Sequence, residues 1–160
     1  MKGKGIVQRI LNILEGIPFG KLFFQVAKIL RSSLLLSSLL CNSEAWFRVS
    51  KPELELLEYV DLMLLRRILE APKTTPKEMI YLELGIIPVM DMIRQRMLNF
   101  LHYILNQENN SILFKVFEKQ AQNKSKNDWV STVCRDLAEI GLNVTFGEIQ
   151  QMSKGKWKTR

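Results

Sequence analysis

Few residues of this chain have the type and spacing that catalysis requires. His102 is the only histidine of the 160 residues, and it directly follows the apolar pair Phe100 and Leu101. Nucleophilic catalysis needs a base beside the nucleophile, so we interpret His102 as a structural histidine at the edge of a helix face. Residues 3–5 (GKG) lack the preceding strand and the Lys-Ser or Lys-Thr pair of a phosphate-binding loop. The sequence therefore predicts neither a nucleophilic centre nor a nucleotide loop.

Acidic residues offer no better candidate for acid–base chemistry. The pairs Glu53 with Glu55 and Asp136 with Glu139 lie in helical patterns with basic neighbours, which is typical of solvated helix faces. We therefore expect that this chain alone is not an enzyme and that it needs no cofactor.

The two cysteines, Cys41 and Cys134, have no second cysteine or histidine at metal-ligand spacing. We expect buried free thiols and no metal site. This usage fits a reducing compartment, so the expected location is intracellular, in the nucleus or the cytoplasm.

Positive charge is concentrated at the two ends of the chain. The net charge is +7, with seven Lys or Arg against two acids in residues 1–50, seven against nine in residues 51–110, and nine against five in residues 111–160. Such an excess favours an anionic partner, nucleic acid above all, although many basic proteins bind none.

Helical periodicity runs through the whole sequence. Apolar residues recur at helical spacing in residues 4–15, which end at Gly16 and Pro18, and a longer helix is predicted from Lys21 to Leu40. Its most apolar run, residues 32–41, is about half the length of a membrane span, so a buried helix is expected and no membrane partner. The predicted fold is an all-α, multi-helix array of about seven or eight helices.

Residues 75–105 carry the strongest local signals, those of two helices joined by an elbow. Thr75 and Glu78 can form a capping box at the start of the first helix. Gly85 supplies a left-handed helix end, and Pro88 restarts the chain as a second helix. Further caps are predicted at Ser50 with Glu53, at Ser111, at Asp128 or Asn127, and at Thr145 with Glu148.

Lys21, Lys28 and Arg31 are seven and three residues apart, so the predicted helix places them on one face. That stripe is either a solvated surface or a ridge that contacts phosphates. The basic tail, residues 154–160, presents the same alternatives: Lys156, Trp157 and Lys158 either remain solvated or stack on a base while binding phosphates.

Several short sequence motifs, in this order along the chain, resemble the region downstream of the polymerase core in LINE-type (non-LTR) retrotransposon reverse transcriptases. The similarity extends over nearly the whole chain. The motifs are residues 27–36 (AKILRSSLLL), 41–47 (CNSEAWF), 64–69 (LLRRIL), 75–78 (TPKE), 82–88 (LELGIIP), 96–102 (RMLNFLH) and 128–130 (DWV).

The resemblance implies a fragment without the fingers and palm of the polymerase. Residues 1–47 resemble the thumb, a helical bundle that holds the template–primer duplex, residues 48–153 resemble a helical connection domain, and residues 154–160 form the basic tail. Residues 59–62 (YVDL) resemble the start of the catalytic Tyr-x-Asp-Asp turn, but Leu62 replaces the second aspartate, and paired metals need both carboxylates. Asp61 is therefore expected to be a surface charge or to pair with Arg66 or Lys51.

The resemblance thus implies a non-catalytic part of a reverse transcriptase that binds an RNA or RNA–DNA duplex independently of sequence. Lys21, Lys28 and Arg31, together with Lys4 and Arg9, would contact backbone phosphates. Two alternatives stay open. The chain is a helical scaffold that binds the missing polymerase core or associates with itself through the apolar run at residues 34–40, or it is a decayed transposon copy without a selected function.

Overall fold

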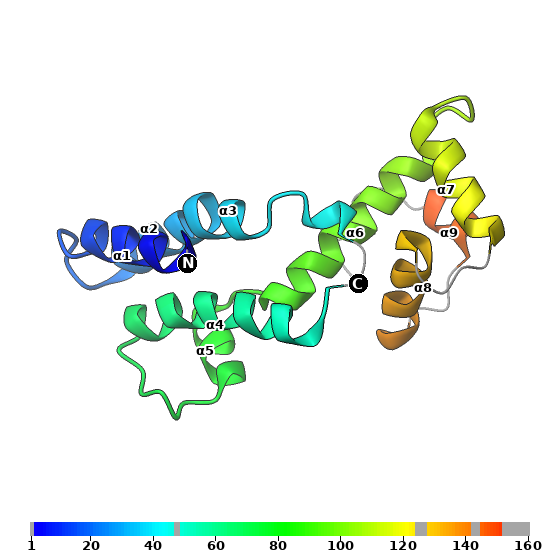
Figure 1. Ribbon diagram of the computed structural model, residues 1–160. Coiled ribbons are helices and arrows are strands. Elements are labelled where there is room, and N and C mark those ends of the chain that lie inside the picture. The colour runs from blue at the N-terminus through cyan, green and yellow to red at the C-terminus, as the bar shows by residue number, and fades with distance from the viewer. Residues whose placement is uncertain (1, 47–48, 124–127, 142–144, 152–160) are drawn as a thin grey trace. The chain divides into compact units, whose positions relative to one another are not determined.

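The computed structural model describes residues 2–46, 49–123, 128–141 and 145–151, and within them it contains helices and no strand (Figure 1). The predicted all-α, multi-helix array is therefore confirmed. The α-helices are α1 (Lys2–Leu14), α2 (Lys21–Leu30), α3 (Ser37–Leu39), α4 (Lys51–Ile68), α5 (Lys77–Leu84), α6 (Val89–Leu105), α7 (Ile112–Asn123), α8 (Trp129–Glu139) and α9 (Phe146–Gln151).

The chain divides into two compact units, and neither is a continuous segment. Unit 1 consists of residues 1–41 and 50–92, and unit 2 of residues 42–49 and 93–160. The predicted boundary at residue 47 does not match this division. The reason is that α4 packs against α1 and α5 packs against α4, so the segment expected to begin a second domain completes the core of the first unit.

Helix α1 approaches α4 closely because its sequence places a glycine at the contact. A Cβ atom on Gly3 would lie only 2.9 Å from Cγ1 of Val60, a separation that no side chain tolerates without a shift. The apolar stripe of α1, at Val7, Ile10 and Leu14, is buried in the same core. The three-to-four-residue spacing of these side chains is what allows one helix face to be buried completely.

The helix predicted from Lys21 to Leu40 is continuous from Lys21 to Leu39, but its middle, Arg31–Leu36, is wound as a π-helix between α2 and α3. This 19-residue helix, with a mean hydropathy of 1.3 in its most apolar window, is long and apolar enough to cross a membrane by length and composition alone. The apolar stretch is therefore longer than the run expected from residues 32–41. Ala27 and Leu35 of this helix are buried in unit 1, whereas only 22% of its most apolar window is buried.

Two capping boxes were predicted at helix starts in unit 1, and only one of them forms. The capping box of Ser50 and Glu53 is confirmed, with the Ser50 N–H donating to Glu53 Oε2 at 2.8 Å. The hydrogen bonds from Ser50 lower the pKa of the Glu53 carboxyl. The box predicted for Thr75 and Glu78 is wrong, because α5 begins one residue later, with Pro76 at the N-cap and no side-chain cap. The Thr75 N–H instead donates to the Pro72 carbonyl in a turn.

Helix α5 ends at the elbow before α6 with a left-handed glycine, as the sequence predicts. Gly85 has φ 57° and ψ 46°, in the left-handed region. The Ile86 N–H donates to the Tyr81 carbonyl at 3.1 Å and the Gly85 N–H to the Leu82 carbonyl at 3.0 Å. This pair of bonds is a Schellman arrangement, which satisfies carbonyls that the helix end leaves without partners.

Gly85→Val is expected to lower the free energy of unfolding by about 1–3 kcal/mol, because a β-branched residue is strained at positive φ. Urea unfolding followed by circular dichroism measures the loss. The substitution should lower the melting temperature, whereas the nucleic-acid affinity of the molecules that remain folded should change little. Gly5→Ala is the control: Gly5 is in α1 with nothing within 4 Å of its Cβ position, so alanine there should be neutral or stabilising. A neutral Gly85→Val would contradict the assigned backbone conformation.

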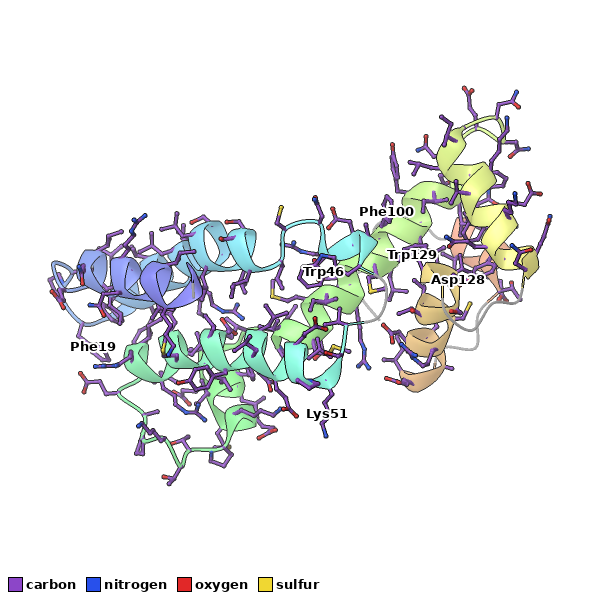
Figure 2. The ribbon with its side chains drawn as sticks, in the orientation of Figure 1. Phe19, Trp46, Lys51, Phe100, Asp128 and Trp129 are labelled. Atoms are coloured by element: carbon purple, nitrogen blue, oxygen red, sulfur yellow. The ribbon has the colours of Figure 1, made fainter. Side chains whose placement is uncertain are left out.

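Unit 2 contains most of α6 together with α7, α8 and α9. Residues Asp128, Ser111 and Thr145 cap their helices as predicted, whereas Asn127 lies outside the described residues. Figure 2 labels Phe100 and Trp129, whose rings meet edge to face with centroids 5.5 Å apart. Trp129 Nε1 also donates to the Glu44 carbonyl at 2.9 Å. The buried apolar side chains of this unit are Ile93, Met97, Leu101, Ile104, Leu105, Phe117, Val130, Val133, Leu137 and Ile149.

Candidate nucleic-acid interface

Arg31 is not a phosphate-contacting residue on the helix surface, which corrects the predicted basic stripe. It is 5% exposed, its Nε donates to Asp61 Oδ1 at 2.7 Å and its Nη2 to Asp61 Oδ2 at 2.8 Å. Nη2 also lies 3.3 Å from the Ile87 carbonyl. A guanidinium held by both oxygens of a carboxylate inside the core is directed away from solvent, so Arg31 does not belong to an exposed phosphate-binding stripe.

The expected environment of Asp61 is also wrong. The side chain is neither a surface charge nor a partner of Arg66 or Lys51, because it is fully buried and pairs with Arg31. Lys51 lies 4.0 Å from Glu55 on the surface of α4, and Arg66 donates to the Thr75 carbonyl. The helical location predicted for Asp61, in the middle of α4, is confirmed.

Tyr81 of α5 adds a third member to this buried cluster. Its hydroxyl lies 3.4 Å from Asp61 Oδ2. Burial, followed by the neighbouring Asp61 charge, raises the pKa of the Tyr81 hydroxyl, so it stays protonated and can donate to the carboxylate. The cluster thereby connects the π-helical segment, α4 and α5 through polar bonds within the apolar core. We call Arg31, Asp61 and Tyr81 the buried polar cluster.

Lys21 and Lys28 are the members of the predicted stripe that remain exposed. They are two turns apart on α2, on the same face of the helix. With Gln25 between them, they line one side of a shallow groove of about 420 Å³, whose other side includes Leu69 and Glu83. Among the described residues, neither lysine has an acidic partner within ion-pair distance, so both ammonium groups can reach an external anion.

Lys4 and Arg9 are exposed on α1, but they do not extend one continuous ridge. Five residues of α-helix separate their directions by about 140°. A straight duplex could therefore contact one of them together with α2, while the other lies on a different face of α1.

The surface of α1 and the helix from Lys21 to Leu39 nevertheless has one sign of charge. Residues 2–40 contain six Lys or Arg and a single acid, Glu15. One of those cations, Arg31, is neutralised by Asp61 of α4. By contrast, residues 51–84, which form α4 and α5, contain five Lys or Arg and seven acids. Unit 1 thus has a basic hairpin, residues 2–40, and an acidic pair of helices.

The other sequence candidates do not join this surface. Lys156, Trp157 and Lys158 lie outside the described residues.

Both cysteines are exposed rather than buried as predicted. The prediction failed for Cys134 because it lies one residue beyond the buried Val133, where the helix turns toward solvent. Partial desolvation and Asp128 raise the pKa of the Cys134 thiol. Among the described residues, no cluster of His, Cys, Asp or Glu could hold a metal ion.

Comparison of the chain with protein-family models, with curated proteins and with solved structures finds no match in any of the three. The resemblance to LINE-type reverse transcriptases therefore stays a hypothesis.

Proposed function

We propose that the chain binds duplex nucleic acid, RNA or an RNA–DNA hybrid, through backbone phosphates on its basic hairpin and without catalysis. The role is that of a thumb and connection fragment of a retroelement reverse transcriptase, which positions the template–primer duplex. The observation that carries the proposal is the separation of charge in unit 1. Lys4, Arg9, Lys21 and Lys28 are exposed on a hairpin whose only acid is Glu15.

This surface favours contacts with phosphates over contacts with base edges. Lysine ammonium groups act as mobile point charges, which bind phosphates without the fixed geometry that base reading needs. If Lys21, Lys28 and one cation of α1 contact phosphates, binding should weaken with a logarithmic salt slope of about −2 to −3. Affinity should therefore vary little with base sequence and strongly with ionic strength.

The paired variant Lys21→Glu with Lys28→Glu is expected to weaken duplex binding at least about tenfold at low salt and to flatten the salt slope by about two. Fluorescence anisotropy of labelled RNA–DNA hybrid, at about 50 mM and about 200 mM salt, measures both effects. Lys51→Glu with Lys73→Glu is the matched control, because it changes the net charge equally on the acidic side of unit 1. Arg31→Glu is unsuitable as a test, since it would place two carboxylates together in the core.

Two results would refute this interface. Equal losses in the two paired variants would show that net charge alone drives association, and an absence of binding at low salt would remove the proposed function.

A second candidate function is a protein-interaction scaffold, favoured by exposed apolar side chains on α2 and in the turn before it. Phe19 is 69% exposed, and Leu22 and Ile29 are similarly open to solvent. The apolar run predicted to mediate self-association is mostly internal, because Leu35, Leu36 and Leu40 are buried. Light scattering separates the two candidates: a mass that rises with concentration and falls to that of a monomer in Leu22→Gln with Ile29→Gln supports the scaffold.

A further inference from the structure

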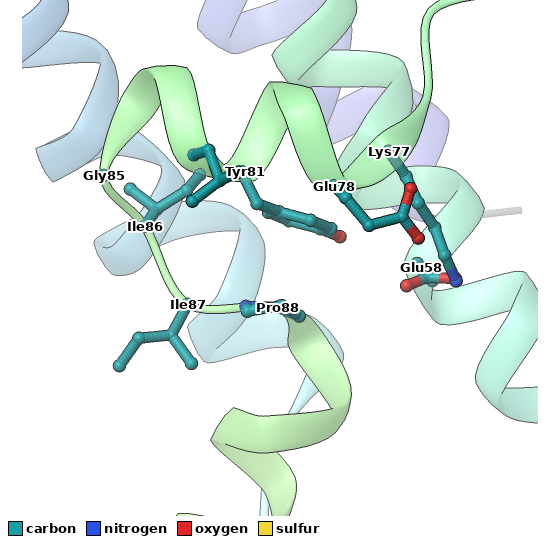
Figure 3. Close-up of a pocket in the computed structure, with 9 residues that line it drawn as sticks. Glu58, Lys77, Glu78, Tyr81, Gly85, Ile86, Ile87 and Pro88 are labelled. Carbon is teal, nitrogen blue, oxygen red and sulfur yellow. The ribbon is translucent and has the colours of Figure 1, made fainter.

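The elbow between α5 and α6 forms one side of an open groove in unit 1 that the sequence did not reveal (Figure 3). Its volume is about 610 Å³, within the range of sites that enclose small ligands or side chains of a partner. In Figure 3, Tyr81 points along the groove from α5, and Ile86, Ile87 and Pro88 lie on the elbow beside it. The lining residues are Glu58, Lys77, Glu78, Tyr81, Leu82, Gly85, Ile86, Ile87 and Pro88.

The groove leaves large apolar side chains in contact with water. Leu82 is 75% exposed and Ile87 is 49% exposed. Covering such side chains with an apolar partner group is favourable, because it removes apolar surface from water. The walls are also preformed, because the left-handed Gly85 and the restrained Pro88 fix the path of the elbow. A ligand would therefore lose little free energy in ordering the site.

One end of the groove has an excess of negative charge. The Lys77 ammonium donates to Glu58 Oε2 at 2.8 Å, and the charges of Glu58, Glu78 and Glu55 all contribute to raising the pKa of Lys77. Two carboxylates, Glu58 and Glu78, thus line this end of the groove with a single ammonium group. This end favours a cation that comes from outside the unit.

We propose that this groove binds a basic amphipathic segment of a partner protein. The apolar side chains of that segment cover Leu82 and Ile87, while a Lys or Arg of the segment reaches Glu78. A second copy of the same face is a poorer occupant, because it would bring like carboxylates together. The site is formed by α4, α5 and the elbow rather than by Lys21 and Lys28, so it is independent of the proposed nucleic-acid interface.

The test uses the full chain and a fluorescein-labelled amphipathic peptide made of Leu and Lys, with two comparison peptides in which Glu replaces Lys or Ser replaces Leu. Fluorescence anisotropy should show binding of the Leu/Lys peptide alone. Leu82→Ser and Glu78→Lys should each weaken it about tenfold, as expected for residues at the centre of a small interface.

Met79→Ser is the matched control, because Met79 is an exposed apolar residue of the same helix that does not line the groove. It should change the affinity less than about twofold. Equal binding of the Leu/Glu peptide, or an unchanged affinity in Leu82→Ser, would overturn the proposal. So would a chain that forms dimers dissociated by Leu82→Ser, because the occupant would then be a second copy.

Discussion

Asp61→Ala is expected to lower the free energy of unfolding by about 3–5 kcal/mol, because it leaves the Arg31 guanidinium buried without its counter-ion. Arg31 makes both of its shortest hydrogen bonds to this carboxylate, at 2.7 and 2.8 Å. Urea unfolding of the full chain, followed by circular dichroism, measures the change in midpoint and slope.

The double variant Arg31→Met with Asp61→Val separates loss of an ion pair from loss of packing. Apolar side chains of similar volume remove both charges at once, so most of the stability should return. Glu55→Ala, which removes an exposed carboxylate from the same helix, should change stability by less than about 0.5 kcal/mol. A similar small loss in Asp61→Ala would mean that the buried polar cluster contributes little. Equal instability of the double variant and Asp61→Ala would instead assign the loss to packing.

Leu64→Ala is expected to lower the free energy of unfolding by about 2–5 kcal/mol, because it opens a cavity in the core of unit 1. Leu64 has no exposed surface, and the residues around it belong to a core formed by α1, α2, α4 and α5. The same urea experiment measures this loss.

The control for Leu64→Ala is Leu56→Ala, two turns earlier in α4 at a side chain that is 47% exposed. It has the same change in composition and helix propensity but leaves a much smaller void. Its expected cost is below about 1 kcal/mol. If both variants lost the same stability, the cost would come from the helix itself and not from burial.

Most helix ends could be predicted from the sequence, because their causes are local. A serine, threonine or aspartate cap interacts with backbone groups three residues away. The capping roles of Ser50, Ser111, Asp128 and Thr145 can therefore be predicted without knowledge of the fold. The role of Gly85 can be predicted for the same reason, since its left-handed backbone is required by the helix end itself. The exception is Thr75, where a competing turn to Pro72 moved the helix start by one residue.

The buried polar cluster could not be predicted, because its members meet only in the folded unit. Arg31 and Asp61 are separated by 30 residues, and spacing along one helix groups Arg31 with Lys21 and Lys28 instead. Periodicity indicates that residues share a face, but it does not tell which other element covers that face. Two lysines of the stripe were therefore placed correctly on an exposed surface, whereas the arginine was assigned to solvent although it lies in the core.

The π-helical winding of Arg31–Leu36 has a consequence for how the length of this chain can vary. Hydrogen bonds that span five residues instead of four accommodate one more residue in a turn than an α-helix does. Deleting Ser33 is therefore expected to restore α-helical winding while Leu35 stays near the face of Arg31. A deletion in α4 would rotate every later side chain by about 100°, which would turn Leu64 and Leu65 away from the core. Homologous chains should accordingly tolerate a single-residue deletion at positions 31–36, and not within residues 51–68.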